Sequence, residues 1–378
     1  LRSLVRITHP RGRLWSSSWL YSWFFYSGLR GYLGSGLINP SRFVSTMANI
    51  AVTSSQPSPK WDSKQVIPLL LLVALIAFPA VQFFGNHNYA IHVVLFAFLY
   101  ITMSSSWNII GGYGGFISIG HNVFFGIGAF FSGFIFARYG ISPFYTALLA
   151  GLVATVFGFA VGLITLRVRG PSFIISSIAL LMIFRIVFDR WELVGAAHGI
   201  TLPHNSLPVE WSKVPHYYAL LILMVGAIFL SWSVRHSKFG LALRAISHDE
   251  IKSEVTGINV RMIKVTAFAL SAFFIGAAGA IWADYLTYVR PNIFFIILIA
   301  ANMVLMCILG GKGTVTGPII GTIVMIFFNE FILAQFGASE LNIFLTGLLL
   351  IITLLYFPEG IVGSLKQRNL LPRFLDWG

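Results

Sequence analysis

Few residues of this sequence are of the types that perform catalysis, and they do not stand in catalytic patterns. The nearest approach to a phosphate-binding loop is Gly311-Lys312, but Met306 lies five residues before Gly311 and Gly313 follows the lysine. Such a loop needs Gly at the first of these positions and Ser or Thr at the second. We therefore expect that this chain does not hydrolyse nucleotides.

Metal chemistry has no better support. The nine His are scattered without the spacing of zinc ligands, and the single cysteine, Cys307, has no His near it in the sequence. The sequence therefore predicts no metal site, no cofactor bound by this chain and no enzyme activity.

A glycine-rich stretch offers a candidate for ligand binding. Ser118, His121 and Asn122 stand at the end of this stretch, just before a long apolar run. Unwound backbone at a helix start presents free N–H groups and the positive end of the helix dipole, which suit a carboxylate. At Gly112 and Gly114 the absence of a side chain would allow close packing or a positive φ in this unwound backbone. A simpler alternative is that Ser118 caps the helix and His121 bonds a neighbouring residue.

Two acids lie inside apolar runs, Asp284 near the end of one run and Glu330 past the middle of another. Ionisable residues at membrane depth are costly, so a functional role is the default hypothesis. Asp284 could instead reach the membrane surface, and Glu330 could form a structural pair. The residues that we predict for a substrate pathway are Gly112, Gly114, Ser118, His121, Asn122, Gly311, Gly313 and Glu330.

The elements that carry these residues must be membrane-spanning helices. Only 10% of the residues are charged, against about 25% in a soluble domain. No charged residue occurs from Gln65 to Ala137, and about 20 apolar residues cross a bilayer as a helix. The fold class is thus predicted as all-α, a polytopic bundle of about ten spans. These spans are about 66–84, 89–109, 116–137, 143–166, 172–188, 215–234, 265–286, 292–309, 318–336 and 341–358.

The formal charge of +13 would suggest a nucleic-acid partner for a soluble protein. Basic residues of membrane proteins gather in cytoplasmic loops, however, so we predict membrane lipid and no nucleic acid as the surroundings. Cytoplasmic termini leave only four basic residues outside, Arg138, Arg190, Lys213 and Arg290, with Arg185 within a span. The cytoplasmic set is Lys60, Lys64, Arg167, Arg169, Arg235, Lys238, Arg244, Lys252, Arg261, Lys264, Lys312, Lys366, Arg368 and Arg373.

The N-terminal part differs from the rest. Residues 1–46 are rich in Arg and Ser and contain no acid, whereas Met47 opens a short polar stretch. We interpret 1–46 as a non-native or upstream-translated segment, although its composition is also typical of a transit peptide. The other predicted divisions are a cytoplasmic tail 47–65, a permease domain 66–358 with an external loop 189–214, and a cytoplasmic tail 359–378.

The segment 235–264 is predicted as a large cytoplasmic loop. Ser247 followed by Glu250 forms a capping box for a short helix, and Gly257 is a natural stop. We expect this helix to lie along the membrane and face a partner, although a merely solvated loop is the alternative. The residues predicted to couple the loop to that partner are Arg244, Asp249, Glu250, Glu254 and Gly257.

An internal repeat also connects two parts of the chain. Gly111-Gly112-Tyr113-Gly114 and Gly310-Gly311-Lys312-Gly313 each precede an apolar run, 199 residues apart. Corresponding glycine-interrupted spans in two halves of a sequence are typical of a transport pathway.

Several of these stretches resemble one family, the permease subunits of branched-chain amino-acid ABC importers, of the LivM type. The resemblance covers about 66 to 365, and departs from the family at Gly195–Ile200 and Phe116-Ile117. The stretches that carry it are 111–121, 124–129, 165–171, 237–246, 249–250, 257–260, 264, 310–318 and 357–360.

The resemblance implies an inner-membrane importer subunit for branched-chain amino acids. It also implies a second homologous permease, two cytoplasmic ATPase subunits that carry ATP and Mg, and a periplasmic amino-acid-binding protein. A related branch of the family carries urea or short amides, so that alternative stays open. The rival from another class is an ion-coupled secondary transporter that uses Glu330 or Asp284 as its ion site.

Overall fold

The computed structural model describes most of the chain beyond residue 62. The described residues are 63–80, 87–168, 170–203, 208, 211–337, 344–345, 347–348, 351–352, 355–357 and 359–368. The segment 1–46, nearly all of the tail 47–65 and half of the predicted span 341–358 lie outside these residues, so those predictions stay untested. The unit described below begins at Ser63.

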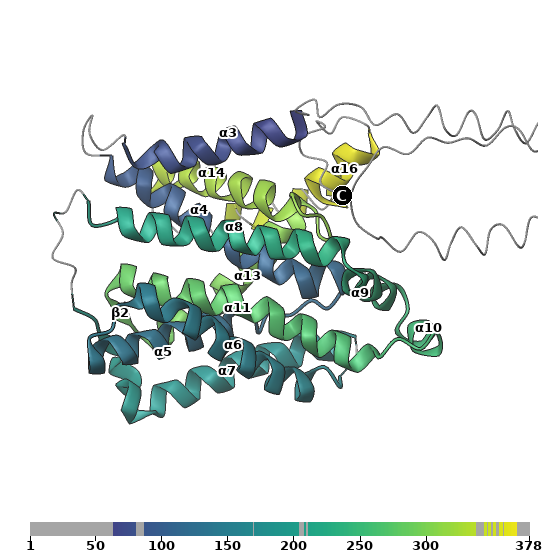
Figure 1. The fold of residues 1–378 in the computed structure, drawn as a ribbon, viewed down its shortest axis with the longest axis horizontal. Coiled ribbons are helices and arrows are strands. Elements are labelled where there is room, and N and C mark those ends of the chain that lie inside the picture. Colours follow the sequence, from purple (N-terminus) through teal and green to yellow (C-terminus); the bar gives the residue numbers. More distant parts are fainter. Residues whose placement is uncertain are drawn as a thin grey trace, which may run out of the picture. The chain divides into compact units, whose positions relative to one another are not determined.

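Long helices run side by side between two ends of the bundle (Figure 1). At one end the antiparallel strands β1 and β2 pair Ile200 with Val289, and we call this the β-ribbon end. The other end carries the short helices α9 and α10. The elements are α3 Ser63–Ala77, α4 Asn88–Asn108, η2 Ile109–Tyr113, α5 Asn122–Tyr139, α6 Pro143–Thr165, α7 Pro171–Arg190, η3 Glu192–Val194, η4 Ala196–His198, β1 Ile200–Thr201, α8 Val214–His236, α9 Lys238–His248, α10 Glu250–Val255, α11 Val260–Leu286, β2 Tyr288–Val289, α12 Pro291–Phe294, α13 Ile297–Gly310, α14 Gly317–Phe336 and α16 Gly360–Gln367.

The predicted helical membrane bundle is confirmed. Within the described residues, seven helices are long and apolar enough to cross a membrane: 88–113, 122–139, 143–165, 171–190, 214–236, 260–286 and 291–310. Two further predicted spans, 66–84 and 318–336, coincide with α3 and α14, whose apolar parts are shorter. A helix pairs its own backbone N–H and C=O groups in hydrogen bonds, whereas the hydrocarbon of the membrane offers them no partners.

Two predicted spans are not continuous helices. The span predicted from residue 116 becomes helical only at Asn122, because residues 114–121 are irregular. The span predicted over 292–309 breaks at Phe295–Ile296, between α12 and α13. The sequence predicted the first break from its glycines, whereas the second was not revealed, since Phe295 and Ile296 are as apolar as the helices beside them.

Helix α11 lies at the centre of the bundle, where small residues allow close packing. A Cβ on Gly276 would lie 3.1 Å from the carbonyl oxygen of Ala150 on α6 and 3.4 Å from that of Phe124 on α5. Close approach of backbones is what holds helices together in lipid, because the hydrophobic effect does not act between them there.

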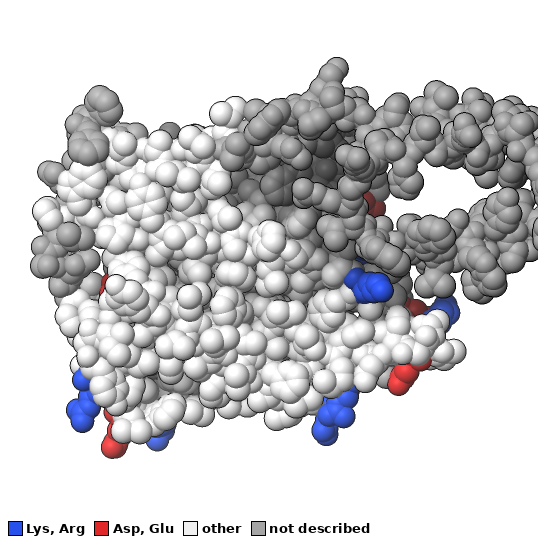
Figure 2. Space-filling model, in the orientation of Figure 1, with Lys and Arg blue, Asp and Glu red and all other residues white. Residues whose placement is uncertain are grey.

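Most charged residues of the described part of the chain lie towards the two ends of the bundle. Figure 2 shows a broad uncharged surface with its Lys, Arg, Asp and Glu residues at either end. By the direction of the helices, Arg138, Arg190, Lys213 and Arg290 lie at the β-ribbon end. The α9–α10 end carries Arg167, Arg235, Lys238, Arg244, Lys252, Arg261, Lys264, Lys312, Lys366 and Arg368. The predicted separation of these residues into two sets is confirmed.

The close packing around α11 predicts the effect of a large side chain there. Gly276→Leu should lower the free energy of unfolding by about 1–3 kcal/mol, because α5 and α6 must move apart. Thermal unfolding of the solubilised protein measures this loss. The control is Leu152→Ala on α6, where the side chain is 53% exposed and the change should stay within about 0.5 kcal/mol. Equal stability of the two variants would contradict the packing argument.

Candidate functional site

The first break replaces helix by an ordered, buried segment. Helix α4 widens into a π-helical turn over Ile109–Tyr113, and residues 114–121 then run without helical structure to the start of α5. We call residues 109–121 the glycine segment. The predicted unwound backbone before α5 is thus present. A Cβ on Gly114 would lie 2.7 Å from the carbonyl oxygen of Ile110, so Gly114 supplies room. Positive φ is found instead at Gly115, with φ +76°.

Side chains from other positions hold the glycine segment in place. The indole Nε1 of Trp107 donates to the carbonyl oxygen of Ser118 at 2.7 Å, and the N–H of Ile119 donates to Ser177 Oγ on α7 at 3.1 Å. The irregular backbone is thus tied to two helices, as non-helical backbone at membrane depth requires.

Three of the predicted pathway residues gather at the end of this segment. Ser118, His121 and Asn122 are all fully buried. His121 Nε2 lies 2.8 Å from Ser271 Oγ on α11. Ser118 Oγ, His121 Nδ1 and Asn122 Oδ1 have no hydrogen-bond partner among the described residues. Ser118 does not cap α5 through its side chain, which removes the simpler alternative for that residue.

Asn122 connects the two breaks. Its amide Nδ2 donates to the carbonyl oxygens of Phe294 and Ile296, at 2.8 and 3.0 Å. These carbonyls flank the interruption between α12 and α13, and that of Phe294, the last residue of α12, has no partner within its own helix. The start of α5 and the break before α13 therefore form one structure.

A second junction, at the α9–α10 end, depends on a residue that the sequence analysis missed. Asn108 accepts a hydrogen bond from the N–H of Gly313 at 2.9 Å and donates to the carbonyl oxygen of Thr314 at 2.7 Å. A Cβ on Gly112 would lie 2.7 Å from the nitrogen of Gly313, so these two predicted residues touch. Gly311, with φ +125°, lies nearby against α16. The polar run that ends at Asn108, near the end of an apolar span, was the available signal.

The internal repeat has a local structural counterpart. Helices α4 and α13 both run towards the α9–α10 end, and each is followed by a glycine-containing turn and a helix that runs back. Residues 199 positions apart touch across this pair: Ser104 donates to the carbonyl oxygen of Met303, and the Cys307 sulfur contacts Asn108.

The two acids within the apolar runs both have partners at the β-ribbon end. Asp284 lies 3.0 Å from His216 Nε2 and is largely buried, so it does not extend to the membrane surface. Tyr89 donates its hydroxyl hydrogen to the carboxylate of Glu330. The structure thus leaves Glu330 apart from the other predicted pathway residues, which lie near the glycine segment.

The predicted coupling loop contains two short helices, and its capping box was wrong. Ser247 lies within α9, while Asp249 caps α10 by accepting from the N–H of Lys252 at 3.0 Å. This hydrogen bond, together with the Lys252 ammonium group, lowers the pKa of the Asp249 carboxyl below its usual range. Gly257 follows the helix with φ +86°, so the predicted stop is confirmed. Arg244 folds back onto the carbonyl oxygen of Arg235 at 3.3 Å.

Of the two predicted coupling glutamates, Glu254 is exposed, whereas only 19% of the Glu250 side chain is exposed. The Glu250 carboxylate lies 2.6 Å from Lys264 Nζ, and only 4% of the Lys264 side chain is exposed. The same ammonium group lies 4.4 Å from the centre of the Phe116 ring, in the glycine segment. A buried cation requires such partners. The pair therefore connects α10 and α11 to the glycine segment.

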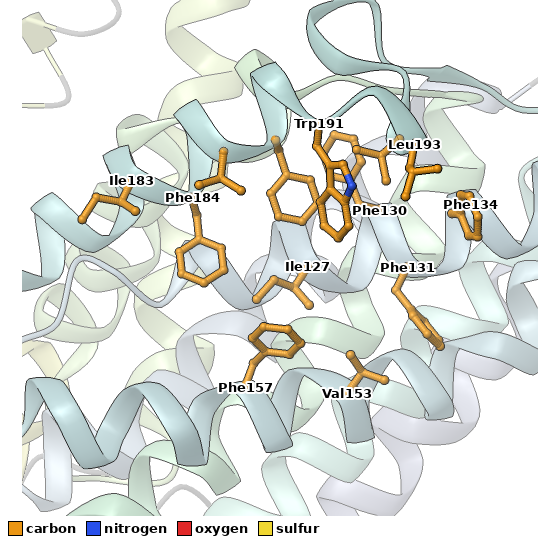
Figure 3. Close-up of a pocket in the computed structure, with 13 residues that line it drawn as sticks. Ile127, Phe130, Phe131, Phe134, Val153, Phe157, Ile183, Phe184, Trp191 and Leu193 are labelled. Atoms are coloured by element: carbon orange, nitrogen blue, oxygen red, sulfur yellow. The ribbon is translucent and has the colours of Figure 1, made fainter.

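A large groove between α5, α6 and α7 has no polar lining other than one indole. Its volume is about 630 Å³, and Figure 3 shows its aromatic and aliphatic side chains around the space, with Trp191 at one side. A charged or zwitterionic ligand would lose its hydration there without gaining hydrogen bonds. This groove is therefore unsuited to an amino acid.

Comparison with known proteins identifies the family. Residues 89–354 match the family model described as the branched-chain amino acid transport system permease component. The chain belongs to this family. It is thus the multi-pass inner-membrane permease of a transport system. This membership argues against the alternative of a self-sufficient ion-coupled transporter.

Individual relatives agree with this membership. The permease protein LivM of a high-affinity branched-chain amino acid transport system in Escherichia coli is 27% identical over 82% of this chain and 80% of its own. Its counterpart LivH from Salmonella typhimurium is 23% identical over 70% and 91%. The ribose import permease protein RbsC of Escherichia coli is 23% identical over 71% and 85%. No solved structure gives a significant match.

The hydrogen bonds by which Asn122 joins the two breaks predict a difference in stability between variants at neighbouring positions. Asn122→Leu leaves the buried carbonyl of Phe294 without a donor, which should cost about 1–3 kcal/mol, whereas Ser118→Ala removes a buried hydroxyl that has no hydrogen-bond partner among the described residues and should cost less than about 1 kcal/mol. Thermal unfolding of the permease, with leucine uptake per inserted complex, measures both variants. A larger loss of stability for Ser118→Ala than for Asn122→Leu would contradict the assigned hydrogen bonds of Asn122.

Proposed function

We propose that this permease imports branched-chain amino acids as one of two membrane subunits of an ABC transporter. The observation that carries the proposal is the family match, together with relatives whose names state branched-chain amino acid transport. The remaining parts would be a homologous permease, two ATPase subunits and a periplasmic binding protein. The permease would bind no nucleotide, because ATP and Mg belong to the ATPase subunits.

The α9–α10 end is the side that we assign to the cytoplasm. Most of the Lys and Arg residues that the structure describes lie there, as the positive-inside rule expects. Both termini would then lie in the cytoplasm. Helix α10 also exposes apolar side chains beside its acids, with Ile251 65% and Val255 84% exposed. Such side chains next to the exposed Glu254 suit a protein partner. We therefore assign the docking of an ATPase subunit to α10.

A movement of α10 would be transmitted to the substrate pathway by the ion pair of Glu250 and Lys264. Their contact ties α10 to α11, and Lys264 also contacts Phe116 in the glycine segment. A cavity of about 310 Å³ between this segment and the corner of α9 and α10 leaves space for displacement. In this proposal, the buried pair transmits the motion that ATP binding produces in the partner.

Reconstitution tests the substrate and the energy source. The permease, its partner subunits and the binding protein in liposomes should take up labelled leucine only with ATP inside. Urea and ribose are the comparison substrates, because related branches and relatives transport such molecules. Uptake of urea or ribose in place of leucine would refute the proposed substrate class. Uptake by this chain alone, driven by an ion gradient, would refute the proposed mechanism.

The docking assignment predicts a loss of assembly without a loss of folding. Val255→Asp should prevent capture of the ATPase subunits, because it places a charge in an apolar contact. Its effect on the stability of the permease itself should stay within about 0.5 kcal/mol, since the side chain is exposed. Val255→Ile is the matched control. Co-purification measures assembly, and normal capture with Val255→Asp would exclude α10 from the docking surface.

The transmission proposal predicts that stability and coupling respond differently. Glu250→Ala leaves Lys264 buried without its carboxylate partner and should cost about 3–5 kcal/mol. The double variant Glu250→Leu with Lys264→Met should recover most of this stability, because apolar residues replace the buried pair. We expect the double variant to hydrolyse ATP while it transports less leucine per ATP. A wild-type ratio of leucine to ATP in the stable double variant would refute the transmission role.

A further inference from the structure

A second cavity differs from the apolar groove in the chemistry of its lining. It has a volume of about 430 Å³ and lies between α4, α5, α11 and the broken helix α12–α13. Its walls include the aromatic residues Phe96, Tyr100 and Trp282 and the amides of Asn292 and Asn302. Volumes of a few hundred Å³, apolar walls and a few polar groups are typical of small-molecule sites.

The aromatic wall is tightly packed. Phe96 makes an edge contact with Tyr100, with ring centres 4.8 Å apart, and lies 5.8 Å from Trp282. Tyr100 and Trp282 are only 4% and 8% exposed. A rigid apolar surface of this kind suits an aliphatic side chain, since its rings do not have to be ordered when the ligand binds.

The amides supply the groups that an amino acid needs at its other end. Each has a carbonyl acceptor and an NH₂ donor, which suit an ammonium and a carboxylate group respectively. Asn302 stands in an otherwise apolar helix and lines the cavity together with Tyr100. Its neighbour Leu298 is 45% exposed on the same helix. An amide turned towards lipid would be costly, so this face favours a polar ligand or a protein surface.

The depth of the cavity agrees with a transport site. At about 1.5 Å per residue, Tyr100 lies about 18 Å from Asn88 and about 20 Å from Tyr113, near the middle of the helix. Ile296, at the break between α12 and α13, lines the same cavity. In transporters, substrates bind near the membrane midplane, where broken helices expose polar groups.

We propose that this cavity is the permease's half of the binding site for an aliphatic amino acid. Phe96, Tyr100 and Trp282 would hold the side chain, and Asn292 and Asn302 would bind the charged groups. The second permease would close its open side. The inference rests on the proposed import of branched-chain amino acids, and it names the site within this chain.

Photolabelling locates the site directly. The complete transporter in nanodiscs is irradiated with a diazirine analogue of leucine, and the labelled peptides are identified by mass spectrometry. We expect labels on peptides that contain Phe96, Tyr100 or Trp282, and excess leucine should remove them. Asn302→Leu should reduce labelling and leucine uptake by about tenfold or more, the effect of losing a hydrogen bond to a charged group.

The controls separate this site from the apolar groove. Phe157→Ala removes an aromatic side chain from that groove and should leave both measurements unchanged. If Asn302→Leu fails to assemble, Asn292→Leu, which alters an exposed position, replaces it. Labels confined to the groove or to the other permease, or normal uptake by the assembled asparagine variant, would overturn the proposed site.

The same experiment distinguishes the two proposals. If the wild-type transporter carries urea or ribose and not leucine, the proposed function fails. If leucine is transported but the cavity is not labelled, only the assignment of the site fails.

Discussion

The structure depends on the requirement that backbone polar groups inside hydrocarbon have hydrogen-bond partners. Continuous helices meet this requirement by themselves, whereas the two breaks do not. Side chains meet it there: Trp107 and Ser177 bind the glycine segment, and Asn122 binds the carbonyls on both sides of the second break. The chain can therefore leave the helical conformation at membrane depth and still keep one arrangement.

Helix α11 relates these parts to one another. Near one end it carries Lys264, which meets Glu250 and Phe116. In its middle Ser271 contacts His121, and towards the other end Trp282 lines the cavity beside the second break. At about 1.5 Å per residue, its 27 residues extend about 40 Å. A single helix thus touches α10, the glycine segment and the proposed binding site.

The sequence predicted the helical class and most of the spans, because long apolar runs without charge have no other stable form in a bilayer. It also placed Ser118, His121 and Asn122 together, since they are nearly adjacent. Asn108 was missed because its partners lie about 200 residues away, and that separation cannot be read from local pattern. Glu250 was misassigned for another reason. Its charge indicated an exposed surface, whereas the ion pair with Lys264, on the next helix, leaves only 19% of its side chain exposed.

The position of Cys307 has a practical consequence for spectroscopy. It is the only cysteine of the chain, it is fully buried, and its sulfur contacts Asn108 within the bundle. Thiol reagents added to the folded protein should therefore leave it unmodified. A spin label or fluorophore attached to an introduced surface cysteine would then report from one position only. The natural sequence can thus serve as the background for distance measurements between the two ends of the bundle, without removal of its own thiol.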